Sequence, residues 1–299
     1  MWFKNLLIYR LTPDWHDDAA SLQARLERHV FRGCMASDAQ AQGWVPPRGN
    51  EGELVVSVER RLLICLGVEQ KLLPSSVVKQ YAQERLAELE DQQGFKPGRK
   101  QAQEVRDAVT LELLPRAFVK RRLTYCWIDP QGGWLVIDAG SSARAEEVIE
   151  QLKLSLGSLP LRPLNTQMSP AAAMTGWLAS NEPPADFTID RDCELRNVDE
   201  DRATVRYARH TLESPEIAQH IAAGKSATRL ALTWQDRISL VLTDQLQVKR
   251  LAFLDLLKEE AERQAERADE LFEADLAIMS GEFTRLLPAL TEALGGEAE

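Results

Sequence analysis

Alternating apolar and polar positions predict strands in the N-terminal part of the chain. The opening alternates through Trp2, Leu6, Ile8 and Tyr9, and Pro13 with Asp14 is expected to start a helix. Two short β-type runs, LVVSVE and RLLICLGV, follow after the loop GWVPPRGNEGE. The proline and glycine residues of that loop argue against regular structure within it. We therefore predict a βαββ start.

The pattern becomes helical from Pro74 to about Asp91 and again from Gly98 to about Leu114, with GFKPG as the connector. The segments FVKRRLTYCWID and WLVIDAG, joined by PQGG, then predict a β-hairpin. Ser141 or Ser142 is expected to cap a helix that runs to Gly157. This order predicts a helical hairpin inserted between the strands of one interrupted sheet.

The stretch SLPLRPLNTQMSPAAA is rich in proline and small polar residues, and it predicts a linker with a boundary near residue 163. A helix near 169–180, β-type runs at 186–198 and 202–209 and a short helix ending at Gly224 follow. The runs TRLALTW, RISLVLT and LQVKRLAF predict a further antiparallel sheet. From Asp255 onward the pattern is helical, with an apolar stripe formed by Phe272, Leu276, Met279, Phe283 and Leu287. The predicted fold class is α+β, with antiparallel sheets, flanking helices, the inserted hairpin and C-terminal helices.

The composition is that of a folded protein, with 44% hydrophobic and 27% charged residues among 299. No apolar stretch is long enough for a membrane span, and the first residues do not resemble a signal peptide. The four cysteines form no CxxC pair, which favours free thiols in a reducing cytosol. We therefore expect a cytoplasmic protein with no membrane association.

Catalytic motifs are not found in the sequence. It holds neither GxxxxGK[ST], GxGxxG nor GxSxG, and its four histidines have no metal-ligand spacing. Neighbouring carboxylates in the acidic helices point to different sides of the helix. The sequence therefore predicts a protein that is not an enzyme, with no cofactor and no metal.

The net charge of −10 argues, as an average, against nucleic-acid binding. That average conceals a segregation, because residues 255–299 hold thirteen acidic and four basic side chains. Residues 96–122 hold eight basic and three acidic ones. A second basic set lies in RATVRYAR and AGKSATRLALTW, namely Arg202, Arg206, Arg209, Lys225 and Arg229. Such clusters can meet phosphate, although a solvated surface patch is the simpler explanation of a charge run taken alone.

Several motifs, in order along the chain, resemble the recombination-associated RdgC family of proteobacteria. They are MWFKNLLIYRL, GWVPP, LLPSSVVKQ, LLPRAF, SLGSLP, AGKSATRLALTW and IMSGEF. The resemblance implies a ring-shaped homodimer that encircles double-stranded DNA without sequence specificity, associates with the nucleoid and inhibits RecA-mediated recombination. It also implies a three-domain subunit: a central domain (1–73 and 119–163), a helical tip domain (74–118) and a base domain (164–299).

The resemblance further implies roles for individual residues. Phe118, in LLPRAF, would make the contact that closes the ring. The DNA-binding residues would be Lys96, Arg99 and Lys100 in the tip and Arg209, Lys225 and Arg229 in the base. The acidic C-terminal helices are expected to lie on the outside of the base or to support the dimer, with the cations turned toward the hole.

Two other readings stay open at this point. The acidic C-terminal helices could instead dock a basic recombination partner, which would make the chain a protein–protein scaffold. A nuclease that uses acidic residues with Mg²⁺ would need a carboxylate constellation that the sequence does not display.

Overall fold

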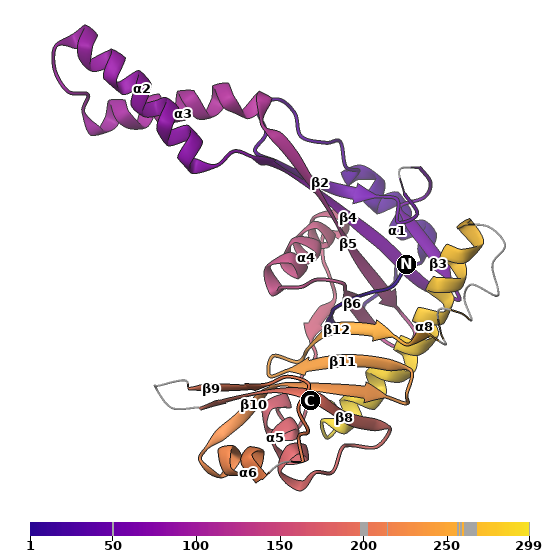
Figure 1. The fold of residues 1–299 in the computed structure, drawn as a ribbon. Helices are drawn as coiled ribbons and strands as arrows, with labels where there is room; N and C mark the ends of the chain where they lie inside the picture. The colour runs from indigo at the N-terminus through magenta and orange to yellow at the C-terminus, as the bar shows by residue number, and fades with distance from the viewer. Residues whose placement is uncertain are drawn as a thin grey trace.

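One antiparallel sheet runs through the whole molecule. The computed structural model describes residues 1–49, 51–197, 203–213, 215–255, 257, 259 and 268–298. Its 12-stranded sheet has the strand order β2-β4-β5-β6-β1-β12-β11-β10-β8-β9, with β3 beside β4 and β7 beside β1. The α+β class is confirmed, but the separate sheets that we expected form a single one (Figure 1).

The N-terminal half of the sheet contains strands β1 to β7. They are β1 (Leu6–Leu11), β2 (Gln40–Val45), β3 (Val55–Val58), β4 (Arg61–Leu72), β5 (Phe118–Asp129), β6 (Trp134–Ile137) and β7 (Leu161–Pro163). The C-terminal half contains β8 (Phe187–Asn197), β9 (Thr204–Tyr207), β10 (Lys225–Trp234), β11 (Ile238–Thr243) and β12 (Gln247–Phe253). The helices are α1 (Ala19–Leu26), α2 (Ser75–Gln93), α3 (Arg99–Leu113), α4 (Ser142–Leu156), α5 (Pro170–Ser180), α6 (Pro215–Ala222) and α8 (Ala268–Ala293).

Strands β1 and β12 join the two halves. Leu6 pairs with Val248 and Leu7 with Gln247, although these residues are far apart in the sequence. The backbone of Lys4 also accepts a hydrogen bond from the N–H of Leu251, at 2.9 Å. The N-terminal strand therefore lies in the middle of the sheet and connects its halves.

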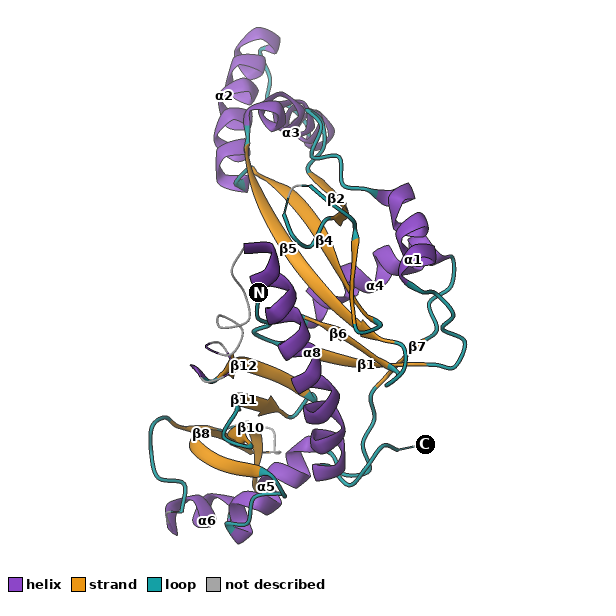
Figure 2. Ribbon diagram, turned by 90° about the vertical axis from the view of Figure 1, so that its right-hand side faces the viewer, coloured by secondary structure: helices purple, strands orange, loops and turns teal. Residues whose placement is uncertain are grey.

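The two faces of the sheet have different cover. The outer face, which carries Leu6, Ile8 and Val248, contributes to one continuous core with helices α5 and α8. The inner face carries Leu7 and Ile137, and in the N-terminal half it packs against α1 and α4. Figure 2 shows α8 lying across the outer face of both halves. In the C-terminal half the inner face carries charged side chains, and among the described residues no helix covers it.

Three local expectations were wrong. The GWV of the predicted loop belongs to β2, in which Gly43 pairs with Gly67 of β4. Glycine is needed at position 43, because a Cβ there would lie 2.6 Å from the backbone of Phe31. Helix α1 begins after Asp18, whose side chain accepts the N–H of Ser21 at 2.8 Å, and not at Pro13 and Asp14. Part of the predicted linker is strand β7, which pairs with β1. The domain boundary near 163 stays a prediction.

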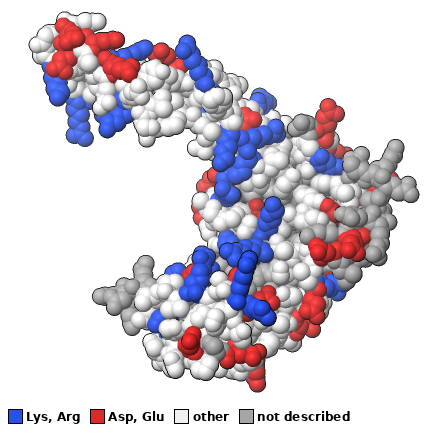
Figure 3. All heavy atoms as spheres, viewed as in Figure 1, with Lys and Arg blue, Asp and Glu red and all other residues white. Residues whose placement is uncertain are grey.

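The inserted helical hairpin projects from the end of the long strands β4 and β5. Helix α2 ends at Gly94, which has the left-handed φ of 76°, and α3 starts after Gly98. Ala82 is the buried residue of α2 and Val109 that of α3, so the hairpin has a small core of its own. Together with the strands and the C-terminal half it borders a hollow that is open on one side of the molecule (Figure 3).

Helix α8 confirms the predicted apolar stripe. Leu276, Met279, Phe283 and Leu287 are buried. Glu282, which is 3% exposed, accepts hydrogen bonds from Arg237 and Arg285 at 2.7 Å. Residues 260–267 of the predicted acidic segment, together with Val198 and Arg202, lie outside the described residues.

A buried hydrogen bond ties α8 to the long strands. The indole N–H of Trp127 donates to Oγ of Ser280 at 2.9 Å, and both side chains are fully buried. Ser280→Ala leaves that N–H without its acceptor, so we expect a loss of about 1–3 kcal/mol in the free energy of unfolding. Denaturant titration measures it, with the exposed Ser180→Ala as control. An unchanged midpoint would show that the bond does not stabilise the docking of α8.

Candidate nucleic-acid interface

The register of the sheet places cations from both halves on one face. Cross-strand partners share a face, and so do residues two apart along a strand. A series of cross-strand pairs connects β5, β6, β1 and β12. Cys126 pairs with Ile137, Ile137 with Leu7, and Leu7 with Gln247. Counting in steps of two along β5 and β12 puts Lys120, Arg122 and Lys249 on this inner face.

The same counting continues across the C-terminal half. Lys249 pairs with Val241, and Val241 pairs with Ala231, two residues after Arg229. Arg229 in turn pairs with Glu194, which pairs with Arg206. The inner face therefore carries Arg196, Arg206, Arg229 and Lys249. Arg250 joins them because it lines the same cavity, and we call these five cations the base patch.

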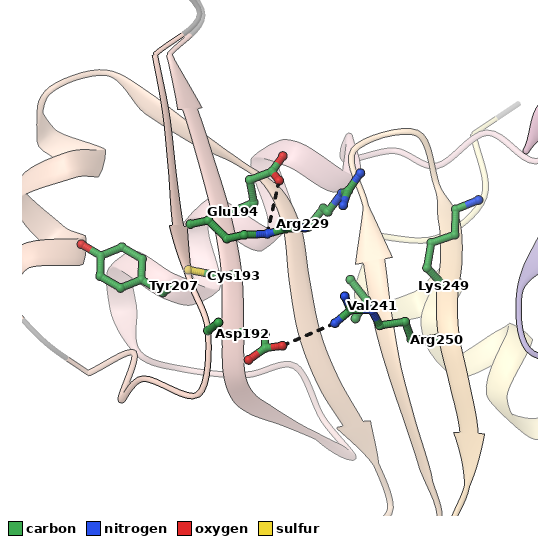
Figure 4. Close-up of a pocket in the computed structure, with 10 residues that line it drawn as sticks. Asp192, Cys193, Glu194, Tyr207, Arg229, Val241, Lys249 and Arg250 are labelled. Atoms are coloured by element: carbon green, nitrogen blue, oxygen red, sulfur yellow. Dashed lines mark ion pairs between the residues drawn. The ribbon is translucent and has the colours of Figure 1, made fainter. Parts of the chain in front are cut away.

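A cavity of about 150 Å³ opens in the base patch (Figure 4). Four of the five cations line it, together with Asp192 and Glu194. Oδ2 of Asp192 lies 3.6 Å from Nη1 of Arg250, and Oε2 of Glu194 lies 3.8 Å from Nε of Arg206. Oε1 of Glu194 lies 3.2 Å from Nη2 of Arg196. The base patch is thus cationic, with carboxylates beside three of its arginines, and two of these three, Arg206 and Arg250, line the cavity.

Arg229 and Lys249 form the uncompensated part of the base patch. Within the described part of the chain, neither side chain makes an ion pair. Nζ of Lys249 donates to the carbonyl oxygen of Gly140 at 3.2 Å. Burial and, secondarily, the nearby charge of Arg229 lower the pKa of Lys249 from its ordinary value. A bound anion would offset both effects, because an opposite charge favours the protonated amine.

A second group of cations lies on the strands that carry the helical hairpin. Lys120 is exposed on the inner face, whereas Arg122 forms an ion pair with Glu147 of α4. Arg121 lies on the other face, 5.1 Å above the ring of Phe31. Figure 3 shows Lys and Arg side chains gathered around the hollow, under the hairpin, on the long strands and on the C-terminal half.

The residues predicted in the base do not all meet. Arg229 belongs to the base patch, and Arg209 lies at its edge, where its backbone N–H donates to Oδ1 of Asp192 at 2.8 Å. Lys225 pairs with Asn197 and shares a face with Ala227 and Leu195, which is the outer face. A bulge at Thr228 separates it from Arg229. Arg202 lies outside the described residues.

The predicted tip residues lie at the far end of the hairpin. Lys96, Arg99 and Lys100 are exposed at the turn between α2 and α3. Phe118 is the first residue of β5, where the helical hairpin joins the sheet. It pairs with Leu72 of β4, and 84% of its surface is exposed. Burial within its own domain, the simplest alternative for Phe118, is excluded. Its role as a contact between subunits stays a prediction.

Sequence reasoning did not assign several cations of the inner face to DNA. They are Lys120, Arg122, Arg196, Arg206, Lys249 and Arg250. The alternation in QVKRLAF was the available signal for Lys249 alone, because it places Lys249 on the face opposite the buried Val248. The positive φ of Arg250, 50°, marks the bulge that also turns Arg250 toward the cavity.

The described residues contain no group of three or more His, Cys, Asp or Glu placed to hold a metal ion. In the same part of the chain, no helix combines the length and apolar character needed to cross a membrane.

The arrangement of the inner face is suited to binding an extended polyanion.

Comparisons with known proteins agree on one family. The family model described as "Putative exonuclease, RdgC" matches residues 1–297. A protein of Dechloromonas aromatica is 56% identical over 99% of this chain and 98% of its own. Proteins of Herminiimonas arsenicoxydans and Janthinobacterium are each 52% identical, over 99% and 100% of this chain and 99% of their own. All three are named recombination-associated protein RdgC.

Proposed function

Because the chain belongs to the RdgC family of recombination-associated proteins, we propose that it binds double-stranded DNA as a ring-shaped homodimer and inhibits RecA-mediated recombination. In this proposal the central domain (1–73 and 119–163), the tip (74–118) and the base (164–299) of two subunits surround the duplex. The protein would act in the cytoplasm on the nucleoid. It would compete with RecA by occupying the DNA.

The one-sided distribution of cations is the observation that supports DNA binding most strongly. The base patch and Lys120 lie on the same face of one sheet. Figure 3 shows that Lys and Arg side chains gather around the hollow. Helix α8 lies on the opposite face, so its acidic side chains do not face the hollow. A duplex in the hollow would meet positive charge despite the net charge of −10.

Lys and Arg side chains on a pleated sheet reach phosphate groups without entering a groove to read bases. We therefore expect binding that is independent of sequence and strongly dependent on salt. Three unrelated duplexes should bind with affinities within about threefold of each other, and the affinity should fall on the order of a thousandfold between 50 and 200 mM salt. Fluorescence anisotropy measures both quantities. Binding that does not respond to salt, or no binding, would contradict the proposal.

RecA inhibition follows from occupancy if DNA binding is the cause. Inhibition of strand exchange should then track the fraction of DNA bound as salt is varied. If inhibition persists where no DNA is bound, the scaffold reading, in which the acidic C-terminal helices dock a basic partner, is favoured.

The family description also names exonuclease activity, whereas the proposal requires binding alone. An end-labelled linear duplex incubated with the protein and Mg²⁺ separates the two. Progressive shortening would establish a nuclease. Intact DNA at saturating protein supports binding without hydrolysis.

A further inference from the structure

Two carboxylates lie inside the base patch, where a surface that only attracts DNA would have none. Asp192 and Glu194 come from β8, and each lies beside one arginine of the same cavity (Figure 4). We propose, on the basis of the proposed function, that these carboxylates are internal competitors of DNA phosphate. They limit the affinity for DNA and keep the bound duplex mobile.

The ion pairs of the base patch are loose. Their N–O distances are 3.2 Å for Glu194–Arg196, 3.6 Å for Asp192–Arg250 and 3.8 Å for Glu194–Arg206. A close pair between a guanidinium and a carboxylate is about 2.7–2.9 Å. Away from this patch the chain forms such pairs, for example Arg48–Glu273 at 2.6 Å. The arginines of the base patch are therefore held near a carboxylate without being fully engaged by it.

The same arginines remain accessible to a ligand. The side chains of Arg196, Arg206 and Arg250 are 44%, 57% and 70% exposed, whereas that of Glu194 is 11% exposed. Thr228 also fixes Glu194, because its hydroxyl donates to Oε1 at 2.8 Å. The carboxylate thus stays in place beneath the guanidinium groups, which can turn toward solvent. An incoming phosphate can take over the guanidinium without displacing the glutamate.

This arrangement has a consequence for movement along DNA. When a phosphate leaves, its arginine returns to a nearby carboxylate and is not left without an anion. Releasing one phosphate and binding the next then costs less than it would for an uncompensated cation. Arg229 and Lys249, which have no such partner among the described residues, supply the net attraction. The base patch therefore combines attraction with rapid exchange.

The test compares Asp192→Asn, Glu194→Gln and the double variant with wild type on one duplex at fixed salt. Removing a negative charge within several ångströms of the bound phosphates should tighten binding by about threefold or more for each site, and by about tenfold for the double variant. Dissociation of preloaded DNA into excess competitor should slow by a similar factor.

Glu273→Gln is the matched control, because it also removes one carboxylate from an arginine pair, but on α8. It should change the affinity by less than about twofold. The proposal is overturned if the double variant binds like Glu273→Gln, or if it binds more weakly, since weaker binding would mean that the carboxylates only orient the arginines.

Failure of the inference can be told apart from failure of the proposed function. If wild type does not bind duplex DNA, the proposed function fails. If wild type binds and the variants do not tighten, only the inference fails. Should Glu194→Gln be unstable, Asp192→Asn still decides, because the Asp192 side chain is 39% exposed and its replacement is not expected to disturb the core.

Discussion

The double charge reversal Arg229→Glu with Lys249→Glu is expected to weaken binding of duplex DNA by about 100-fold. These two side chains provide the positive charge of the base patch that no carboxylate of the described chain compensates. The change removes two attractive contacts and places two negative charges beside the phosphates. Arg229 is exposed and Lys249 partly exposed on the inner face, so the fold should persist.

Anisotropy titrations across a salt series measure this effect. The slope of log K against log salt should also become less steep by about one for each lost phosphate contact. Lys225→Glu is the informative comparison, because it makes the same kind of charge change on the outer face of the same strand. If Lys225→Glu weakens binding as much as the double variant, DNA contacts are not confined to the inner face.

Local elements could be predicted well from the sequence because local signals specify them. Helices α2 and α3 follow from a change of period, and their ends are set by Gly94 and Gly98. The hairpin of β5 and β6 follows from the turn PQGG. In each case the residues that decide the structure are neighbours in the chain.

The joining of the two half-sheets could not be predicted in the same way. It depends on the pairing of Leu7 with Gln247, and no local pattern specifies the partner of a strand so distant in sequence. The sequence therefore suggested separate sheets. The continuity of the inner face, which unites Lys120 with the base patch, is a consequence of that pairing.

One bulge explains why the predicted base residues separate. Strict alternation along KSATRLALTW would put Lys225 and Arg229, four residues apart, on one face. Thr228 is an extra residue in the ladder between Ala227 and Arg229, and it reverses the facing of everything before it. A bulge of this kind has no dependable signal in a single sequence. Charge alone therefore indicated a basic strand, while the register decides which cations act together.

Phe118→Ala is expected to abolish stable closure of the ring. An aromatic side chain that is 84% exposed in the single chain gains most by burial against a second subunit. Loss of such an anchor costs about 2 kcal/mol or more, which is a factor of roughly 30 in the closure equilibrium. The two-fold symmetry of a dimer would apply that cost on both sides of the contact.

Retention on circular DNA measures closure directly. A closed wild-type ring should stay on a circular duplex through a high-salt wash that breaks phosphate contacts, and linearising the DNA should release it. In the same wash, the Phe118→Ala variant should dissociate from circular and linear DNA alike. At low salt its affinity for a short linear duplex should fall by less than about tenfold, because the base patch is intact. Met35→Ala, which removes another exposed apolar side chain outside the tip, should behave like wild type. Retention of Phe118→Ala on circular DNA would show that Phe118 does not close the ring.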